Sequence, residues 1–255
     1  LKKPFRDSAV GLAAKGIATI RYDKRTQVYG MHFAEDYRKA TVQDESIDDA
    51  ISAVNMVSSF PGLDSNHIYL LGHSLGAMLA PRIAAQCKKI KGIVMMAGDS
   101  RPLLDVMAEQ IKYLASVDTA DSAADMKNSQ ALLRKIKNAQ SPSLNNNTPD
   151  SLLPFGIPAA YWIDLNHYNQ VKTAAQLKIP ILIMQGERDY QVTMQDFALW
   201  KKALAKNKNV QFKSYPKLYH LFMEGTGKST PAEYDNPNHI PVYVINDIAA
   251  FVNKK

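Results

Sequence analysis

Short apolar runs alternate with amphipathic segments along most of the chain. Three of the runs are almost continuously apolar, which is typical of strands buried on both faces of a parallel sheet. With two flanking runs of weaker pattern, the predicted strands are 16–23, 67–73, 91–98, 179–186 and 210–216. Helical periodicity predicts helices at 5–15, 42–59, 75–88, 194–206 and 240–253. This alternation predicts an α/β fold in which helices cover both faces of a mostly parallel sheet.

The alternation is interrupted between Arg101 and Gln176, a stretch too long for one crossover helix. It holds helical patterns at 102–117 and 122–139, then the polar "SPSLNNNTPDSLLPFGIP" and the apolar "AAYWIDLNHY". An insertion between two strands of such a sheet usually forms a lid over the carboxyl ends of the strands, where ligands bind. The expected segments are a core part at 1–99, a helical lid at 100–176 and a second core part at 177–255.

Composition adds limits rather than a function. The 255 residues are 46% hydrophobic and 22% charged, as in one sizeable soluble domain. The net charge is +7, but the basic residues are scattered or sit at predicted helix ends, which favours a solvated surface over a nucleic-acid or membrane patch. The single cysteine, Cys87, excludes an internal disulfide, and no Cys/His motif indicates a metal site. No run is long enough to span a membrane and no signal segment opens the chain, so a cytoplasmic and a secreted location both stay open.

The strongest candidate for chemistry is Ser74, in the sequence Gly72-His73-Ser74-Leu75-Gly76. The G-x-S-x-G pattern serves catalysis when the serine lies on a tight turn between a buried strand and a helix, where small neighbours allow close packing. Predicted strand 67–73 and helix 75–88 supply both flanks. The alternative is a serine that only caps the helix.

A serine nucleophile needs a base and an acid that orients the base, and in this arrangement both follow the serine on loops after strands. Asp189 lies just past strand 179–186. Glu187 competes with it but would sit inside the turn itself. His220 follows strand 210–216, whereas His239 lies at the entry to the last helix. The predicted triad is therefore Ser74, Asp189 and His220.

With these motifs the chain resembles the α/β-hydrolase superfamily, in particular bacterial serine carboxylesterases related to the dienelactone-hydrolase and prolyl-oligopeptidase-like groups. The likeness covers nearly the whole chain and rests on "RYDKRT" after the first predicted strand, "GHSLGAMLAPRIA", "YWIDLNHY", "QGERDYQVT" and "YPKLYHLFMEG". It implies catalysis by the same triad, no cofactor, and a lid that shapes the substrate pocket. Tyr161 and Trp162 are the aromatic residues expected in that pocket, with packing inside the lid as the alternative.

The likeness has one gap, at the start of the chain. In this fold the Leu75 backbone N–H and an N–H from a loop after the third strand form the oxyanion hole. Matched in order, 16–23 is the fourth strand and 67–73 the fifth, and the third lies between them. Without it, two rows of backbone groups stay unpaired at about 1 to 3 kcal/mol each, against a net stability of roughly 5 to 15 kcal/mol. We therefore expect an upstream segment of the same polypeptide to carry the first three strands and the second donor.

The resemblance implies a carboxylesterase that cleaves small-molecule esters with small to medium acyl or alcohol groups through an acyl-enzyme. The triad alone does not distinguish an ester from an amide, so a serine peptidase or acyltransferase remains an alternative. A non-catalytic binding module with the same fold is a further alternative.

Overall fold

The computed structural model describes residues 4–117 and 123–254 of the chain. Two compact units are present, each built from separated stretches of sequence. The first unit comprises Leu1–Tyr22, Ala50–Ser100 and Gln170–Lys255, and the second comprises Asp23–Asp49 and Arg101–Asn169. The second unit contains most of the predicted lid at 100–176, together with the earlier stretch 23–49. That this segment acts as a lid over the substrate site stays a prediction.

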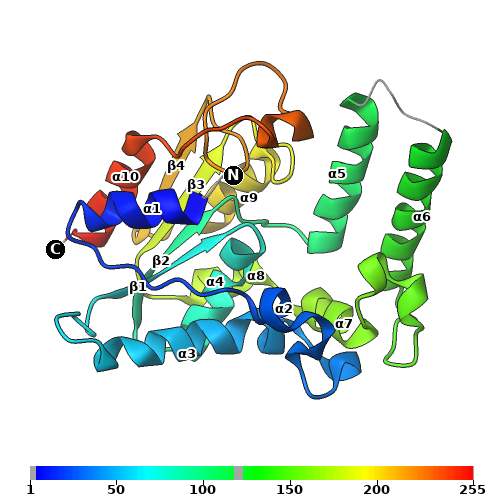
Figure 1. Ribbon diagram of the computed structural model, residues 1–255, viewed down its shortest axis with the longest axis horizontal. Coiled ribbons are helices and arrows are strands. Elements are labelled where there is room, and N and C mark those ends of the chain that lie inside the picture. The colour runs from blue at the N-terminus through cyan, green and yellow to red at the C-terminus, as the bar shows by residue number, and fades with distance from the viewer. Residues whose placement is uncertain (1–3, 118–122, 255) are drawn as a thin grey trace. The chain divides into compact units, whose positions relative to one another are not determined.

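A parallel sheet forms the centre of the first unit. Its strands are β1 (Ile68–His73), β2 (Ile90–Met96), β3 (Ile181–Gly186) and β4 (Val210–Tyr215), side by side in that order (Figure 1). All three pairings are parallel. Because parallel strands end at the same edge, the loops that follow β1, β3 and β4 meet at one end of the sheet.

Helices cover the two faces of this sheet. The first unit contains the helices α1 (Pro4–Ala13), α4 (Leu75–Gln86), α8 (Gln170–Gln176), α9 (Met194–Leu204) and α10 (Val242–Val252). It also contains most of α3 (Asp48–Met56), whose first two residues belong to the second unit. Helix α4 packs against β1 and β2 and α9 against β3, while α1 packs against α10. The predicted α/β fold with a parallel sheet is confirmed.

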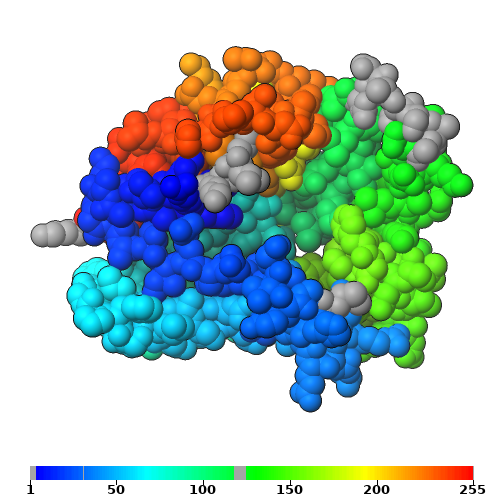
Figure 2. Space-filling model, in the orientation of Figure 1, coloured from blue at the N-terminus to red at the C-terminus, as the bar shows by residue number. Residues whose placement is uncertain are grey.

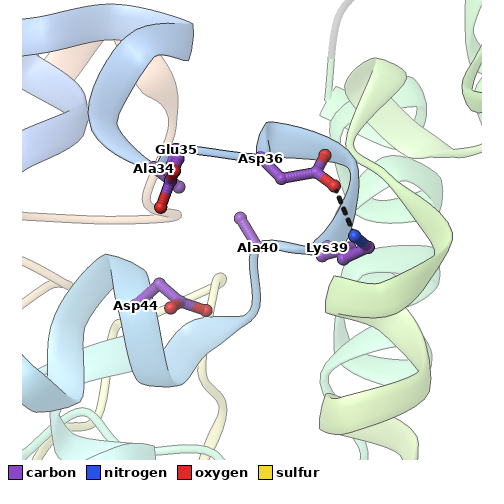
Figure 3. A pocket seen from close by; sticks show the side chains of 6 residues that line it. All are labelled: Ala34, Glu35, Asp36, Lys39, Ala40 and Asp44. Atoms are coloured by element: carbon purple, nitrogen blue, oxygen red, sulfur yellow. Dashed lines mark ion pairs between the residues drawn. The ribbon is translucent and has the colours of Figure 1, made fainter.

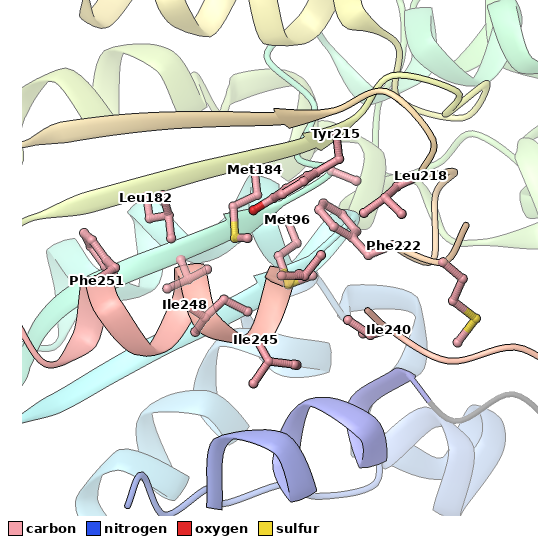
Figure 4. Close-up of a cluster of buried hydrophobic side chains, with 14 of the residues drawn as sticks. Met96, Leu182, Met184, Tyr215, Leu218, Phe222, Ile240, Ile245, Ile248 and Phe251 are labelled. Atoms are coloured by element: carbon pink, nitrogen blue, oxygen red, sulfur yellow. The ribbon is translucent and has the colours of Figure 1, made fainter. Parts of the chain in front are cut away.

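One face of the sheet is sealed by a cluster of buried apolar side chains (Figure 4). Met96 and Met184 point from β2 and β3 toward Ile245 and Ile248 of α10, which lie one helical turn apart. Phe222, from the loop after β4, completes the cluster beside them. Each such side chain, when fully buried, contributes about 1.5 to 3 kcal/mol, so the loop that follows β4 is anchored in the core of the unit.

The predicted strand at 16–23 is wrong. Residues 17–24 form neither helix nor strand, and the Ile20 and Tyr22 side chains are 41% and 48% exposed. This part of the chain lies on the surface (Figure 2). A strand requires a neighbour with which its backbone pairs, and within the described residues β1 pairs only with β2, so the apolar run 16–23 has no sheet to join.

The second unit is helical in its described part. It contains α2 (Arg25–Tyr29), α5 (Leu103–Val117), α6 (Ala123–Ala139) and α7 (Ala159–His167). Short 3-10 turns lie at Gly30–Phe33, Tyr37–Lys39, Asp150–Leu152 and Pro154–Gly156, and a π-helical turn at Gln43–Ile47. In the first unit, 3-10 turns lie at Val57–Ser59 and Pro231–Tyr234. The helix predicted at 122–139 begins at Ala123, and residue 122 lies outside the described residues.

Candidate active site

Ser74 lies in a strained turn between β1 and α4. Its backbone angles are φ 55° and ψ −122°, a conformation that a residue with a side chain rarely adopts. Such strain persists only where the surroundings enforce it, and it gathers at functional sites. The Ser74 N–H donates to the Met96 carbonyl at 2.9 Å, and the Ser74 side chain makes no capping hydrogen bond to the helix. The conformation is that of a nucleophile elbow rather than of a helix cap.

Two glycines permit this turn. A Cβ atom at Gly72 would lie 2.2 Å from the Gly76 carbonyl oxygen, and one at Gly98 would lie 2.9 Å from the Ala77 Cβ. At Gly72, β1 approaches α4, and at Gly98, the segment after β2 approaches α4, in each case more closely than a side chain would allow. Gly76 differs, because a Cβ there would meet nothing within 4 Å in the described chain.

Asp189 is buried in the loop after β3, with its side chain fully enclosed. Its Oδ1 accepts the backbone N–H groups of Gln191 and Val192 at 2.8 and 3.0 Å. Its Oδ2 accepts from His220 Nδ1 at 2.8 Å and from Gln185 Nε2 at 3.2 Å. Four donors thus hold the carboxylate in one orientation, which suits an acid that fixes the tautomer of a histidine.

Glu187, the competing acid, is placed differently. Its side chain is exposed and accepts a hydrogen bond from Ser214 Oγ at 2.8 Å. The competing base, His239, has a side chain that is 85% exposed and pairs with Asp7. In the described chain neither residue takes part in the Asp189 and His220 pair.

His220 is held in the loop that follows β4 and is only 5% exposed. The loop is tight: the Phe222 N–H donates to the Tyr219 carbonyl at 2.8 Å, and Phe222 has a φ of 57°. This loop also packs against the loop after β3 that carries Asp189. The Arg188 N–H donates to the Leu218 carbonyl, and a Cβ at Gly186 would lie 2.5 Å from that same oxygen. Backbone contacts between the two loops therefore fix the positions of Asp189 and His220 relative to each other.

His73, the residue before Ser74, meets the base loop directly. Its Nε2 lies 2.8 Å from the His220 carbonyl oxygen, and the two imidazole rings are 4.6 Å apart. Burial lowers the pKa of His73 to about 4, His220 adds to this effect, and the hydrogen bond to the His220 carbonyl opposes it. Sequence reasoning missed both His73 and Gln185, although His73 is the last residue of β1 and Gln185 the second-last residue of β3, the strands that lead to Ser74 and Asp189.

The structure brings Ser74 into the neighbourhood of His220 through this contact. Within the described residues no hydrogen bond joins the Ser74 hydroxyl to His220. Catalytic hydrogen bonds of this kind are often long without substrate and tighten when substrate binds. Helix α4 begins at Leu75, and the first N–H groups of a helix have no acceptor inside it, so the Leu75 N–H can donate to a substrate.

Tyr161 and Trp162 belong to the second unit, on α7. The Tyr161 hydroxyl donates to Glu45 Oε2 at 2.7 Å, and burial together with Glu45 raises the pKa of Tyr161 above its ordinary value. Trp162 is 2% exposed and donates to the Ile157 carbonyl at 3.2 Å. Tyr161 lines a cavity of about 240 Å³, and Trp162 does not. The other residues around this cavity are Thr26, Gly30, Phe33, Tyr37, Ala40, Glu45, Ile157 and Pro158.

A wider hollow in the second unit is acidic (Figure 3). The carboxylates of Glu35, Asp36 and Asp44 lie around a space of about 500 Å³. Lys39 pairs with Asp36 at 2.9 Å, and this contact lowers the pKa of Asp36. Across the described part of the chain, no group of three or more histidine, cysteine or acidic residues is arranged to hold a metal ion.

A parallel sheet with a strained serine after one strand, and an acid and a histidine after two others, defines an α/β-hydrolase. Two solved structures share the fold. Est1E from Butyrivibrio proteoclasticus is 15% identical over 100% of this chain and 83% of its own, with a TM-score of 0.59. The Pyrococcus furiosus esterase Pf2001 is 16% identical over 98% of this chain and 75% of its own, with a TM-score of 0.56.

The family follows from the sequence. The model of the family described as serine aminopeptidase, S33, matches residues 4–226, so the chain belongs to that family. Esterase EstD from Thermotoga maritima is 40% identical over 252 residues, which is 99% of this chain. The chain spans 57% of the length of that relative. No helix in the described ranges is long and apolar enough to cross a membrane.

Proposed function

We propose that this protein is a serine hydrolase that cleaves carboxylic esters through an acyl-enzyme intermediate. One observation carries the proposal: Ser74 is strained at φ 55° at the end of β1, and the residue before it contacts His220, which is paired with buried Asp189. A serine that only stabilised a helix would not need this conformation. The high similarity to a relative named as an esterase supports the same reaction class.

The proposed reaction has two halves. Ser74 Oγ attacks the ester carbonyl while His220 takes its proton, and Asp189 stabilises the imidazolium that forms. The Leu75 N–H donates to the developing oxyanion. His220 then gives its proton to the leaving alcohol, and in the second half it activates a water molecule that releases the acid and restores Ser74.

The proposed substrate is a small-molecule ester with a small to medium apolar group. Tyr161 is the proposed contact residue, because it lines the 240 Å³ cavity in the second unit, which is mostly apolar apart from Glu45. Trp162, also expected at the substrate, is better suited to pack α7 against the turn at Ile157. The family description favours peptide substrates as the second candidate, so an amino-acid anilide belongs in every assay beside the esters.

We also propose that an upstream segment of the same polypeptide completes the sheet along the free edge of β1. Among the described residues only β2 pairs with β1, and Tyr69, Leu70 and Leu71 remain half-buried, unlike the residues of β3. The relative EstD is longer than this chain, which covers 57% of it. The segment would bring the first three strands and the second oxyanion donor.

Covalent labelling tests the function. A fluorophosphonate probe should label the wild-type chain in its active preparation, and p-nitrophenyl acetate, butyrate and octanoate should be hydrolysed faster than an alanine p-nitroanilide. Ser74→Ala should lose both signals, and Ser58→Ala, at an exposed serine, should lose neither. If a folded preparation that includes the proposed upstream segment is not labelled, the proposal is contradicted. If the anilide is cleaved faster than the esters, the proposed activity is that of a peptidase and not of an esterase.

The upstream segment is tested by comparing the present 255 residues with a polypeptide extended at the amino terminus. Loss of one oxyanion donor costs about 100-fold to 1000-fold in turnover, so the extended protein should exceed the shorter one by that factor. Intact-mass measurement must show the segment in the more active sample. Equal turnover of both proteins would contradict this part of the proposal.

A further inference from the structure

His73 stands out among the groups that the proposed reaction does not use. It is the last residue of β1, directly before Ser74, and it reaches 147 positions along the sequence to the main chain of His220. A carbonyl oxygen can only accept a hydrogen bond, so His73 Nε2 must carry the proton. The neutral tautomer with hydrogen on Nε2 satisfies this contact.

The surroundings of His73 favour that neutral form. Phe5 from α1 and Phe222 from the base loop approach its ring edge-on, with centroids 5.9 and 6.4 Å away. The titratable groups that face it are His220, which disfavours a charge on His73, and Asp189, which favours one. Burial and His220 together outweigh Asp189 and the hydrogen bond to the His220 carbonyl, and they lower the pKa of His73. A charged His73 would also oppose the imidazolium that forms on His220 during the reaction, since the two rings are 4.6 Å apart.

The hydrogen bond between His73 and the His220 carbonyl joins two parts of the site that are 147 positions apart in the sequence. Asp189 holds the His220 ring at Nδ1, and His73 holds the His220 main chain at its carbonyl. The one ring nitrogen left is Nε2, the atom that must exchange a proton with Ser74. The backbone is strained close to both partners of this hydrogen bond, with a φ of 55° at Ser74, next to His73, and of 57° at Phe222, two residues after His220.

We propose that His73 is a positioning residue, a neutral donor whose Nε2–H bond to the His220 carbonyl sets the distance between the nucleophile and its base. The inference rests on the proposed function of Ser74 and His220 and adds a residue to it. An error of about 1 Å in such a distance lowers turnover by about 100-fold. His73 itself exchanges no proton with substrate.

The test compares three variants. His73→Phe keeps a ring and loses the donor, His73→Gln keeps an N–H at a similar reach, and His239→Gln is the matched control at an exposed histidine away from the pair. We expect His73→Phe to lower kcat on p-nitrophenyl butyrate by about 10-fold to 100-fold with KM within about twofold. His73→Gln should recover kcat to within about fivefold of wild type, and His239→Gln should match wild type.

A purely structural role gives a different result. In that case His73→Phe and His73→Gln would lower the melting temperature together, and kcat per folded molecule would stay at the wild-type value, which would overturn the inference. A His73→Gln variant as slow as His73→Phe would also overturn it, because the donor would then not be the feature that matters.

A measurement without turnover separates this inference from the proposed function. In ¹⁵N-labelled Ser74→Ala protein, the imidazole spectrum should show His73 protonated at Nε2 and unprotonated at Nδ1 from pH 8 down to about pH 5. The Nδ1–H tautomer, or titration near the ordinary histidine pKa, would overturn the inference. A wild-type protein that neither binds the fluorophosphonate probe nor cleaves esters, yet shows this tautomer, would contradict the proposed function and leave the contact itself established.

Discussion

Strands β1 and β3 lie in one parallel sheet, yet they are buried to different degrees. Every residue of β3 is buried, whereas in β1 only Ile68 and Gly72 are. Strand β3 has neighbours on both edges, β2 and β4, and β1 has β2 alone among the described residues. At their ends the contrast continues: Asp189 after β3 has four hydrogen-bond donors, while the hydroxyl of Ser74 after β1 makes no capping bond.

The two halves of the candidate site are therefore held in place by different means. The proposed acid and base are held by two loops whose backbones contact each other, and Asp189 is enclosed by four hydrogen-bond donors. The proposed nucleophile, Ser74, is held by a strained turn on a strand that pairs with only β2 among the described residues.

The largest effect is expected at the nucleophile. Ser74→Ala should lower kcat/KM for p-nitrophenyl butyrate by about 10⁴-fold or more, because the remaining groups cannot form an acyl-enzyme. Its melting temperature should stay close to wild type, since the side chain makes no capping bond. Steady-state hydrolysis and a thermal melt measure the two. Activity within about tenfold of wild type would remove Ser74 from the mechanism.

The next effect separates the two acids that follow β3. Asp189→Asn should lower kcat by about 10³-fold to 10⁴-fold, because the amide no longer selects the tautomer of His220. Glu187→Gln should change kcat by less than about twofold, because Glu187 is exposed and contacts Ser214 instead. The two variants differ from wild type by the same chemical change at positions two residues apart. A reversed order of effects would assign the acid to Glu187.

The two glycines on either side of the Ser74 turn are expected to differ in how much an added methyl group destabilises the protein. Gly72→Ala places a methyl group 2.2 Å from the Gly76 carbonyl and should cost about 2 to 3 kcal/mol of folding free energy. Gly76→Ala meets nothing in the described chain and should be neutral or stabilise helix α4 by about 0.5 kcal/mol. Urea unfolding followed by circular dichroism compares them. If Gly76→Ala is as destabilising as Gly72→Ala, the space beside Gly76 is filled in the protein.

Acid should weaken the contact between β1 and the base loop. The pKa of His73 is about 4 in the folded protein and about 6.5 when unfolded, so the unfolded chain binds the extra proton between these values. The free energy of unfolding should therefore fall as the pH drops from 6.5 to 4, by on the order of 2 kcal/mol from this group. His73→Gln cannot titrate, so its stability should fall less over the same range. Parallel loss in both proteins, measured by urea unfolding, would contradict this assignment.

The smallest effect is expected in the second unit. Tyr161→Phe removes the donor to Glu45, which keeps its ion pair with Lys24 at 2.9 Å. Loss of one hydrogen bond at a partly buried carboxylate should cost about 1 kcal/mol. If Tyr161 contacts the ester as proposed, KM should rise by about threefold with kcat unchanged. An unchanged KM for every acyl length would assign Tyr161 to packing alone.

Local signals made most of the core predictable. The apolar run of β3 and the regular spacing of apolar residues in α9 and α10 each reflect burial of the residues concerned, so a pattern read from neighbouring positions locates the element. The described ends of these elements lie within two residues of the predicted ones. The exception, 16–23, has the composition of a strand, but its state depends on a partner strand that its own residues do not encode.

The amino-acid sequence alone was enough to predict the four strands β1 to β4 and their chain order, the turn at Ser74, and the loops that carry Asp189 and His220. These depend on residues close together in the chain and on the rule that parallel strands end at one edge. Three features became visible only in the folded chain: Asp189 is enclosed while Glu187 is exposed, His73 contacts the His220 main chain, and the Tyr161 hydroxyl donates to Glu45. Each of these depends on atoms brought together from distant parts of the chain, where burial and hydrogen-bond geometry, rather than local pattern, select the partner.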